Sequence, residues 1–145
     1  MISKDSVHAS DKVHLNHTDE VIFSVLSDLS SYNAWWPWAK IRKIDETTYE
    51  VSPLGPGSFT WSISETVENR KIVLSYDGIF RGHGTWSIEK EGAMTHLTYA
   101  VSLEIEDRFL KFINRLIPIK KLHSAMMKKV FTQLITYLNN HHIES

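Results

Sequence analysis

Hydrophobic and polar residues alternate along most of the chain from Trp38 to Glu104, and this pattern predicts an antiparallel β-meander. Groups of turn-forming residues divide this part of the chain at positions 45–48, 53–57, 68–69, 78–82 and 91–92. A meander of this kind folds through successive hairpins, so neighbouring strands in the sequence become neighbours in the sheet.

The predicted turns define a register for the three central hairpins. A two-residue turn after Val67 pairs Trp61 with Tyr76. The next two turns place Trp86 opposite Leu74 on one side and opposite Leu97 on the other. In this register the large apolar residues all fall on one face of the sheet: Phe59, Trp61, Ile63, Leu74, Tyr76, Trp86, Ile88, Leu97, Tyr99, Val101 and Leu103. The opposite face receives mainly serine, threonine, histidine and Asp77, so we expect one face to be buried and the other to be wet.

The N-terminal part of the chain predicts a strand followed by two helices. Residues 6–16 alternate with period two, although Asp11 interrupts the apolar series. Thr18 is a good N-cap for a helix that runs to about Leu29, and a short second helix should stop at Pro37 because the residue before proline avoids the α-helical region.

The C-terminal part, from about Glu106 to Asn140, has the spacing of an amphipathic helix, and Pro118 should break or kink it near Ile117. The stretch after Pro118 is long enough to cross a sheet. The expected fold is therefore α+β: a seven-stranded antiparallel sheet, two short helices after the first strand, and a long C-terminal α-helix.

Composition and charge limit the classes of protein and the kinds of site that the chain can form. The 145 residues suit one domain spanning 1–145, and the absence of cysteine excludes disulfides and zinc–thiolate sites. Because there is neither a long apolar run nor an apolar leader, we expect a soluble, cytoplasmic protein. The first 106 residues carry a net charge of −6 and the last 39 carry +5. That basic helical stretch is the solvated face of a helix or a contact site for an anionic membrane or acidic partner. The balanced total charge argues against nucleic-acid binding.

Three sequence segments resemble the polyketide cyclase/dehydrase and lipid-transport superfamily, also called START-like or SRPBCC. They are the helix 18–29, the motif Ser31-Tyr32-Asn33-Ala34-Trp35-Trp36-Pro37-Trp38, and the run Gly82-His83-Gly84-Thr85-Trp86 with the strand after it. The resemblance covers nearly the whole chain and implies a helix-grip fold, in which the sheet wraps around the last helix and encloses a cavity. Members bind lipids, sterols, hormones or polyketides; some catalyse cyclisation and others are co-chaperones, so the fold alone does not assign a function.

The candidate ligand-binding residues are the inward aromatic residues, the facing residues of the last helix, and one arginine in the loop 78–82 that could meet an anionic head group. They are Trp36, Trp61, Tyr76, Arg81, Trp86, Tyr99, Met126, Met127 and Phe131. The alternative for the aromatic residues is a solid core. We expect no catalytic residue, metal or cofactor. His83 falls on the outer face beside Asp77, Glu65 has inward parity but lies near the end of the sheet, and the histidines lack the spacing of metal ligands.

Three functions remain open from the sequence. The first is binding or transport of a small hydrophobic ligand, either a lipid or a polyketide-like molecule, in the internal cavity. The second is a cyclase- or dehydrase-like enzyme, for which no base with a partner is evident. The third is a co-chaperone-like module that binds a protein through Trp35, Trp36 and Trp38 or through the basic helix.

Overall fold

The computed structural model describes residues 5–37, 39–53 and 57–141. Within these residues the chain forms seven strands, one α-helix and one short 3-10 helix near its start, and two α-helices at its C-terminal end. In chain order the elements are β1 (Ser6–Leu15), α1 (Asp19–Ser27), η1 (Leu29–Ala34), β2 (Ala39–Lys43), β3 (Thr48–Pro53), β4 (Phe59–Val67), β5 (Lys71–Gly78), β6 (Phe80–Glu91), β7 (Met94–Ile105), α2 (Arg108–Leu116) and α3 (Ile119–His141).

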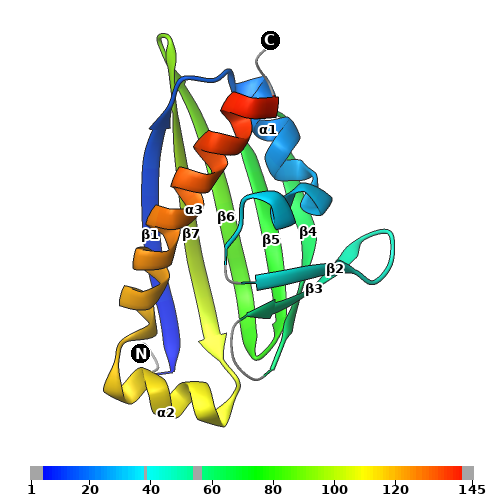
Figure 1. The fold of residues 1–145 in the computed structure, drawn as a ribbon. Coiled ribbons are helices and arrows are strands. Elements are labelled where there is room, and N and C mark those ends of the chain that lie inside the picture. The colour runs from blue at the N-terminus through cyan, green and yellow to red at the C-terminus, as the bar shows by residue number, and fades with distance from the viewer. Residues whose placement is uncertain (1–4, 38, 54–56, 142–145) are drawn as a thin grey trace.

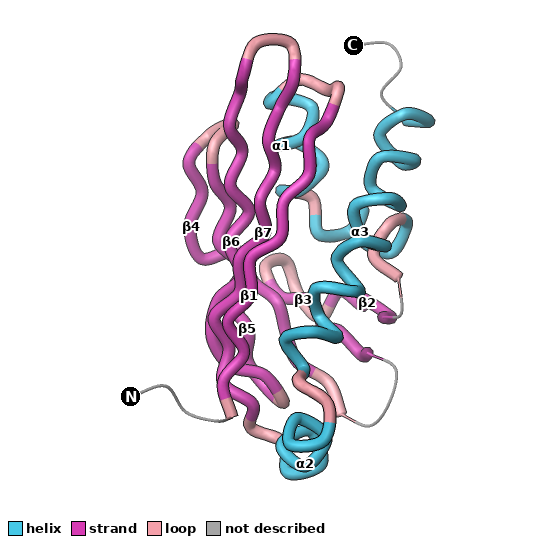
Figure 2. The backbone as a smooth tube through the Cα atoms, turned by 90° about the vertical axis from the view of Figure 1, so that its left-hand side faces the viewer, coloured by secondary structure: helices cyan, strands magenta, loops and turns pink. Residues whose placement is uncertain are grey.

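The strands form one antiparallel sheet in the order β1-β7-β6-β5-β4-β3-β2. Helix α3 crosses one face of the sheet (Figure 1), and in the turned view the sheet and α3 form two layers, with α2 lying across one end (Figure 2). The short helices α1 and η1 lie toward the other end. This arrangement confirms the predicted α+β fold, in which a seven-stranded sheet packs around a long C-terminal helix.

The predicted faces of the sheet are correct, but two of the three predicted registers are wrong. Trp61 pairs with Tyr76 as expected. Trp86, however, pairs with Ile72 and Tyr99, two residues away from the predicted partners. The connections cause both shifts: β5 and β6 are separated by a single residue instead of a five-residue loop, and the last hairpin turns at 92–93, one residue further along than expected, which moves each partner by two. A shift of two leaves every side chain on its predicted face, because side chains alternate with period two.

A β-bulge overturns the expected position of Glu65. The register of β4 against β5 slips between Ile63 and Glu65, so that Glu65 lies opposite Val73. The extra residue turns the Glu65 side chain to the outer face, where its carboxylate forms an ion pair of 2.7 Å with Lys71. Glu65 is therefore not available to an internal cavity.

The start of α1 and the break in the C-terminal stretch lie where the sequence predicts them, whereas α1 ends at Ser27 and η1 at Ala34, before the expected Leu29 and Pro37. The Thr18 hydroxyl accepts a hydrogen bond from the Val21 N–H at the start of α1. Pro118 divides the C-terminal stretch into two helices: α2 ends at Leu116, and α3 begins immediately after the proline.

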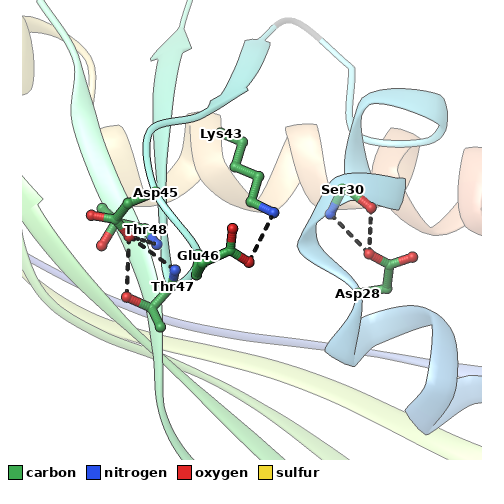
Figure 3. A network of polar contacts seen from close by, with 7 residues as sticks. All are labelled: Asp28, Ser30, Lys43, Asp45, Glu46, Thr47 and Thr48. Carbon is green, nitrogen blue, oxygen red and sulfur yellow. Dashed lines mark hydrogen bonds and ion pairs between the residues drawn. The ribbon is translucent and has the colours of Figure 1, made fainter.

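Local polar contacts hold the turn between β2 and β3, as Figure 3 shows. The Asp45 carboxylate accepts hydrogen bonds from the N–H groups of Thr47 and Thr48, both at 2.9 Å. These bonds, led by the one from Thr47, lower the pKa of Asp45. Lys43 and Glu46 form a 3.4 Å ion pair beside the turn. This hairpin closes the far edge of the sheet and carries part of the wall described below.

Candidate functional site: an apolar cavity between the sheet and α3

The half of the interior nearer to α1 and η1, called here the packed half, is a dense aromatic core. Its central rings belong to Tyr32, Trp35, Trp86 and Tyr99, all buried, and the Trp86 and Tyr99 ring centroids lie 4.3 Å apart. Its polar atoms are paired: the Trp86 Nε1–H donates to the Tyr32 hydroxyl at 3.0 Å, and that hydroxyl donates to the Leu26 carbonyl at 2.7 Å. Burial raises the pKa of Tyr32 well above its ordinary value, so the hydroxyl remains a neutral donor and acceptor.

The half of the interior nearer to α2 contains a cavity of about 190 Å³. Its walls come from the sheet, from the end of the η1 segment and from the first two turns of α3. Four predicted site residues line it: Trp36, Trp61, Tyr76 and Met126. Ten further residues complete the lining: Val7, Ala39, Val51, Pro53, Phe59, Phe80, Leu103, Ile119, Leu122 and His123.

Five predicted ligand-binding residues lie elsewhere. Trp86, Tyr99, Met127 and Phe131 are buried in the core beside or beyond the cavity rather than in its wall. Arg81 belongs to strand β6 instead of a loop, and strand alternation points it to the outer face, where it forms a 3.4 Å ion pair with Asp77. For Arg81 the structure thus contradicts the expected position at a cavity mouth.

The remaining sequence expectations concern the outer face and the tryptophan cluster. His83 is exposed on the outer face, as its parity predicts, but its strand partner is Ser75 and not Asp77. Trp35 and Trp36 are buried, so neither contributes to an exposed docking patch. Trp38 lies outside the described residues.

Of the ten lining residues that the sequence analysis did not name as ligand-binding, His123 is the one with a titratable side chain. It occupies the second turn of α3, and its ring stacks near Tyr99 at a centroid distance of 6.2 Å. The available signal was its position one residue after Leu122, which follows the apolar stripe of the helix; a histidine beside that stripe could be read as solvated. Burial lowers the pKa of His123, while Asp11 on β1 raises it in part. The imidazole is therefore neutral near pH 7.

Tyr76 and Tyr99 mark the boundary between the cavity and the packed half. Their hydroxyl oxygens lie 2.5 Å apart and share a hydrogen bond. Burial raises the pKa of Tyr76 to about 12 and that of Tyr99 well above its ordinary value, so both phenols stay protonated. Gly84 makes room for this pair, because a Cβ atom at that position would lie 2.1 Å from the Tyr99 hydroxyl oxygen.

Two buried polar atoms of the cavity wall have no hydrogen-bond partner among the described residues: Trp61 Nε1 and His123 Nδ1. The Trp61 indole lowers the pKa of Tyr76 against the effect of burial, but its N–H does not meet the hydroxyl in hydrogen-bonding geometry. A buried polar group without a partner costs about 1–3 kcal/mol. Both residues line the cavity, but the two nitrogen atoms are buried within its wall, so a molecule in the cavity pairs with them only if these side chains shift.

The described residues provide neither a metal centre nor a membrane-spanning helix. No group of three or more histidine, aspartate or glutamate side chains among them is arranged to hold a metal ion. No described helix is long and apolar enough to cross a bilayer. The chemistry of this interior rests on its apolar walls, one histidine, two paired tyrosines and one indole N–H.

Solved structures with the same fold come from several bacteria. A conserved protein from Geobacillus kaustophilus superimposes with a TM-score of 0.77 at 16% identity, covering 92% of this chain and 96% of that one. A START superfamily protein from Mycobacterium smegmatis gives 0.72 at 21% identity, covering 92% and 97%. A Thermus thermophilus protein gives 0.68 at 12% identity, covering 90% and 98%. At these identities the likeness establishes the fold alone.

Sequence comparison gives the family. A search of proteins with curated descriptions found no significant match. Residues 15–135 match the family described as polyketide cyclase / dehydrase and lipid transport. That match extends from the end of β1 to the last turns of α3 and so includes most of the cavity wall. Family and fold together suggest a ligand-binding domain, and the chain belongs to the polyketide cyclase / dehydrase and lipid transport family.

Proposed function

We propose that the protein binds a small apolar molecule that carries one polar oxygen, in the cavity between the sheet and α3. The observation that carries this proposal is the coincidence of an apolar cavity with two unpartnered polar atoms, Trp61 Nε1 and His123 Nδ1. Ligand sites combine apolar walls with a few orienting polar groups in this way.

The volume limits the size of the ligand. An apolar cavity of about 150 Å³ in another protein holds benzene. The cavity here, at about 190 Å³, has room for one substituted ring or a short branched chain without movement of the walls. A longer acyl chain requires the cavity to open, and the wall with the least cover is α3 near the half-exposed Leu122.

The two polar atoms define which oxygen the ligand presents. The Trp61 indole only donates, so the ligand must supply an acceptor. His123 is neutral near pH 7, and its Nδ1 atom can accept from a hydroxyl or donate to a carbonyl, depending on the tautomer. A phenol, an alcohol or a ketone meets both requirements, whereas a hydrocarbon meets neither.

Matched probes test this proposal. We expect 4-methylphenol to bind more tightly than 1,4-dimethylbenzene, which has nearly the same shape but no oxygen, by roughly three- to tenfold for one net hydrogen bond. Titration calorimetry and the shift in melting temperature measure the difference. Native mass spectrometry of the freshly purified protein shows whether a molecule of this kind is already bound.

The variants Trp61→Phe and His123→Phe separate shape from hydrogen bonding. Each should bind the hydrocarbon about as well as the wild type while losing the preference for the phenol. Val67→Ser, at an exposed position at the opposite end of the sheet, is the matched control and should change neither affinity. Failure of both probes to bind would contradict the proposal, and equal binding of the two would contradict its polar part.

His123 also favours a second candidate function, that of a cyclase or dehydrase. A neutral imidazole in an apolar site can remove a proton from the carbon next to a ketone. The resulting enolate would attack a second carbonyl of the same molecule, and the new alkoxide would take the proton back. The product is an isomer of the substrate, or the isomer less one water after dehydration.

Incubation with a short aromatic diketone, followed by mass spectrometry and chromatography, distinguishes the two functions. Turnover by the wild type that is lost in His123→Phe, with binding of 1,4-dimethylbenzene retained, would favour the enzyme. A diketone that binds and is recovered unchanged would favour the binding function over the enzymatic one.

A further inference from the structure

Helix α2 presents an apolar ridge to solvent at the cavity end of the molecule. Phe109, Phe112 and Leu116 are 52%, 56% and 65% exposed and lie on one side of the helix, at spacings of three and four residues. Ile117 and Leu122, which follow the helix closely in the chain, are also large exposed apolar residues. These five make up most of the large exposed hydrophobic side chains of the described residues; the other two, Ile44 and Val67, lie apart from them in sequence.

Cationic residues accompany the ridge. Arg108 and Arg115, seven residues apart, lie along one edge of it, and Lys111 follows on the same side of the helix. Lys120 and Lys121 come directly after the break at Pro118. The sequence contains no aspartate or glutamate from 108 to 143. Lys111 forms a 3.9 Å ion pair with Asp5, so its charge is partly balanced.

The α2 ridge is followed closely in the chain by residues of the cavity wall. Leu122 is half-exposed on the outside and lines the cavity on the inside, and Ile119, one turn earlier in α3, also lines it. Figures 1 and 2 both place α2 across the end of the two layers where α3 begins. An apolar molecule that leaves the cavity beside Leu122 would meet the α2 ridge first.

We propose that α2 docks the protein on an anionic lipid surface, with Phe109, Phe112 and Leu116 inserted among the acyl chains and the cations at the level of the head groups. An exposed helix with an apolar ridge and a basic edge has the chemistry of an interfacial helix. Arginine and lysine can hold their charges in the head-group layer while their alkyl stems rest on apolar surface. The added statement that docking places the cavity mouth at the membrane rests on the proposed binding function; the docking itself does not.

Charge distinguishes the lipid surface from a second copy of this chain. Pairing two α2 ridges face to face would bring two like-charged edges together without any acidic side chain between residues 108 and 143 to balance them. An anionic membrane supplies the opposite charge and an apolar interior at the same time.

Sedimentation with vesicles tests docking without any cavity ligand. We expect the full chain to bind vesicles of phosphatidylglycerol and phosphatidylcholine, and to bind pure phosphatidylcholine weakly. The variant Arg108→Gln/Arg115→Gln should weaken binding to the anionic vesicles by roughly fivefold per charge removed. The variant Phe109→Ser/Phe112→Ser should weaken it at least tenfold.

Two double variants are the controls and should leave vesicle binding unchanged. Ile44→Ser/Val67→Ser is the control for two exposed apolar residues elsewhere, and Lys128→Gln/Lys129→Gln is the control for two cations further along α3.

Insertion can be observed directly because the sequence has no cysteine. An environment-sensitive dye on Phe112→Cys should shift to the blue with anionic vesicles, and the same dye on Val67→Cys should not. Three results would overturn the proposal: no binding to anionic vesicles, binding that the ridge substitutions do not weaken, or self-association that those substitutions abolish while vesicle binding is unchanged. Loss of vesicle binding with retained binding of 4-methylphenol would separate docking from the cavity function.

Discussion

The packed half and the cavity half are built from the same strands and the same helix, yet the hydrogen bonding of their buried polar atoms differs. In the packed half the Trp86 indole donates to Tyr32, and Tyr32 donates to a backbone carbonyl. In the cavity half the Trp61 indole N–H makes no hydrogen bond to any described residue, although Trp61 is as deeply buried as Trp86. Two tryptophans of equal burial thus belong to two kinds of interior.

Whether a buried polar atom has a hydrogen-bond partner distinguishes core residues from site residues better than the exposed fraction does. A folded core pairs its buried polar groups because an unpaired one is costly. A binding site can leave such groups without a partner in the protein, because a ligand or a water molecule can pair with them. On this criterion the aromatic residues near α1 and η1 are core, and Trp61 and His123 belong to the site.

Removing a large side chain from each half should give the largest contrast in stability. Trp86→Ala removes a ring packed on all sides and should lower the free energy of unfolding by about 3–5 kcal/mol. Phe80→Ala removes a ring that borders existing empty space and should lower it by about half as much. Urea unfolding measures both; equal losses would show that the cavity half is packed as tightly as the other.

At the boundary of the two halves, Gly84→Ala should lower the free energy of unfolding by about 2–3 kcal/mol, toward the upper end of the usual range for overpacking. The new methyl group would meet the Tyr99 hydroxyl at 2.1 Å, and β6 is held by neighbours on both sides and cannot easily move away. Adding Tyr99→Phe removes the atom that clashes most. The double variant should therefore lose less stability than the sum of the two single losses.

Much of the sheet could be predicted from the sequence because alternation is a local signal. Period two predicts the correct face for Trp61, Tyr76, Trp86 and Tyr99. Two pairings were predicted two residues out of register, and a shift of two does not change the face of a side chain. Glu65 was placed wrongly because a bulge changes the parity without any glycine or proline to reveal it.

The site could be predicted only in part. A side chain that points inward can be closely packed or can border a cavity, and the sequence pattern does not distinguish the two. Trp61 and Trp86 share a face and a pattern, and only the position of α1, η1 and α3 above them decides which one borders a cavity. His123 lies beside the apolar stripe of α3, and its burial depends on the distant Tyr99 ring and the β1 strand. These contacts between distant parts of the chain leave no local pattern in the sequence.

Removing one hydroxyl or one indole N–H should distinguish paired from unpaired groups. Tyr32→Phe leaves the Trp86 N–H without its acceptor and should cost about 1–2 kcal/mol of stability. Trp61→Phe removes a donor that has no partner, at the price of a smaller ring, and should cost less than Tyr32→Phe despite the larger change in volume. Thermal and urea unfolding of the ligand-free proteins compare them. A larger loss for Trp61→Phe would mean that its indole is structural.

The smallest expected effect is the pH dependence contributed by His123. Burial lowers the pKa of this histidine in the folded protein, so below about pH 6.5, the ordinary value for histidine, the unfolded chain binds a proton that the folded protein resists. Stability should therefore be fully present above that pH and fall as the pH drops through 6.5 toward the folded pKa. Asp11, which faces the histidine from β1 and accepts a hydrogen bond from Ser124, reduces this loss without reversing it.

The variant His123→Gln should flatten this part of the profile, because glutamine does not titrate. His83→Gln, at an exposed position on the outer face of the sheet, is the matched control and should leave the profile as in the wild type. Unfolding free energies between pH 5 and pH 8 measure the slope for all three proteins. A wild-type slope that His123→Gln leaves unchanged would place the acid sensitivity elsewhere. A slope of opposite sign in the wild type, steeper than in His123→Gln, would mean that the imidazole is stabilised in its charged form, and the cavity would then present a cation rather than a neutral partner to its ligand.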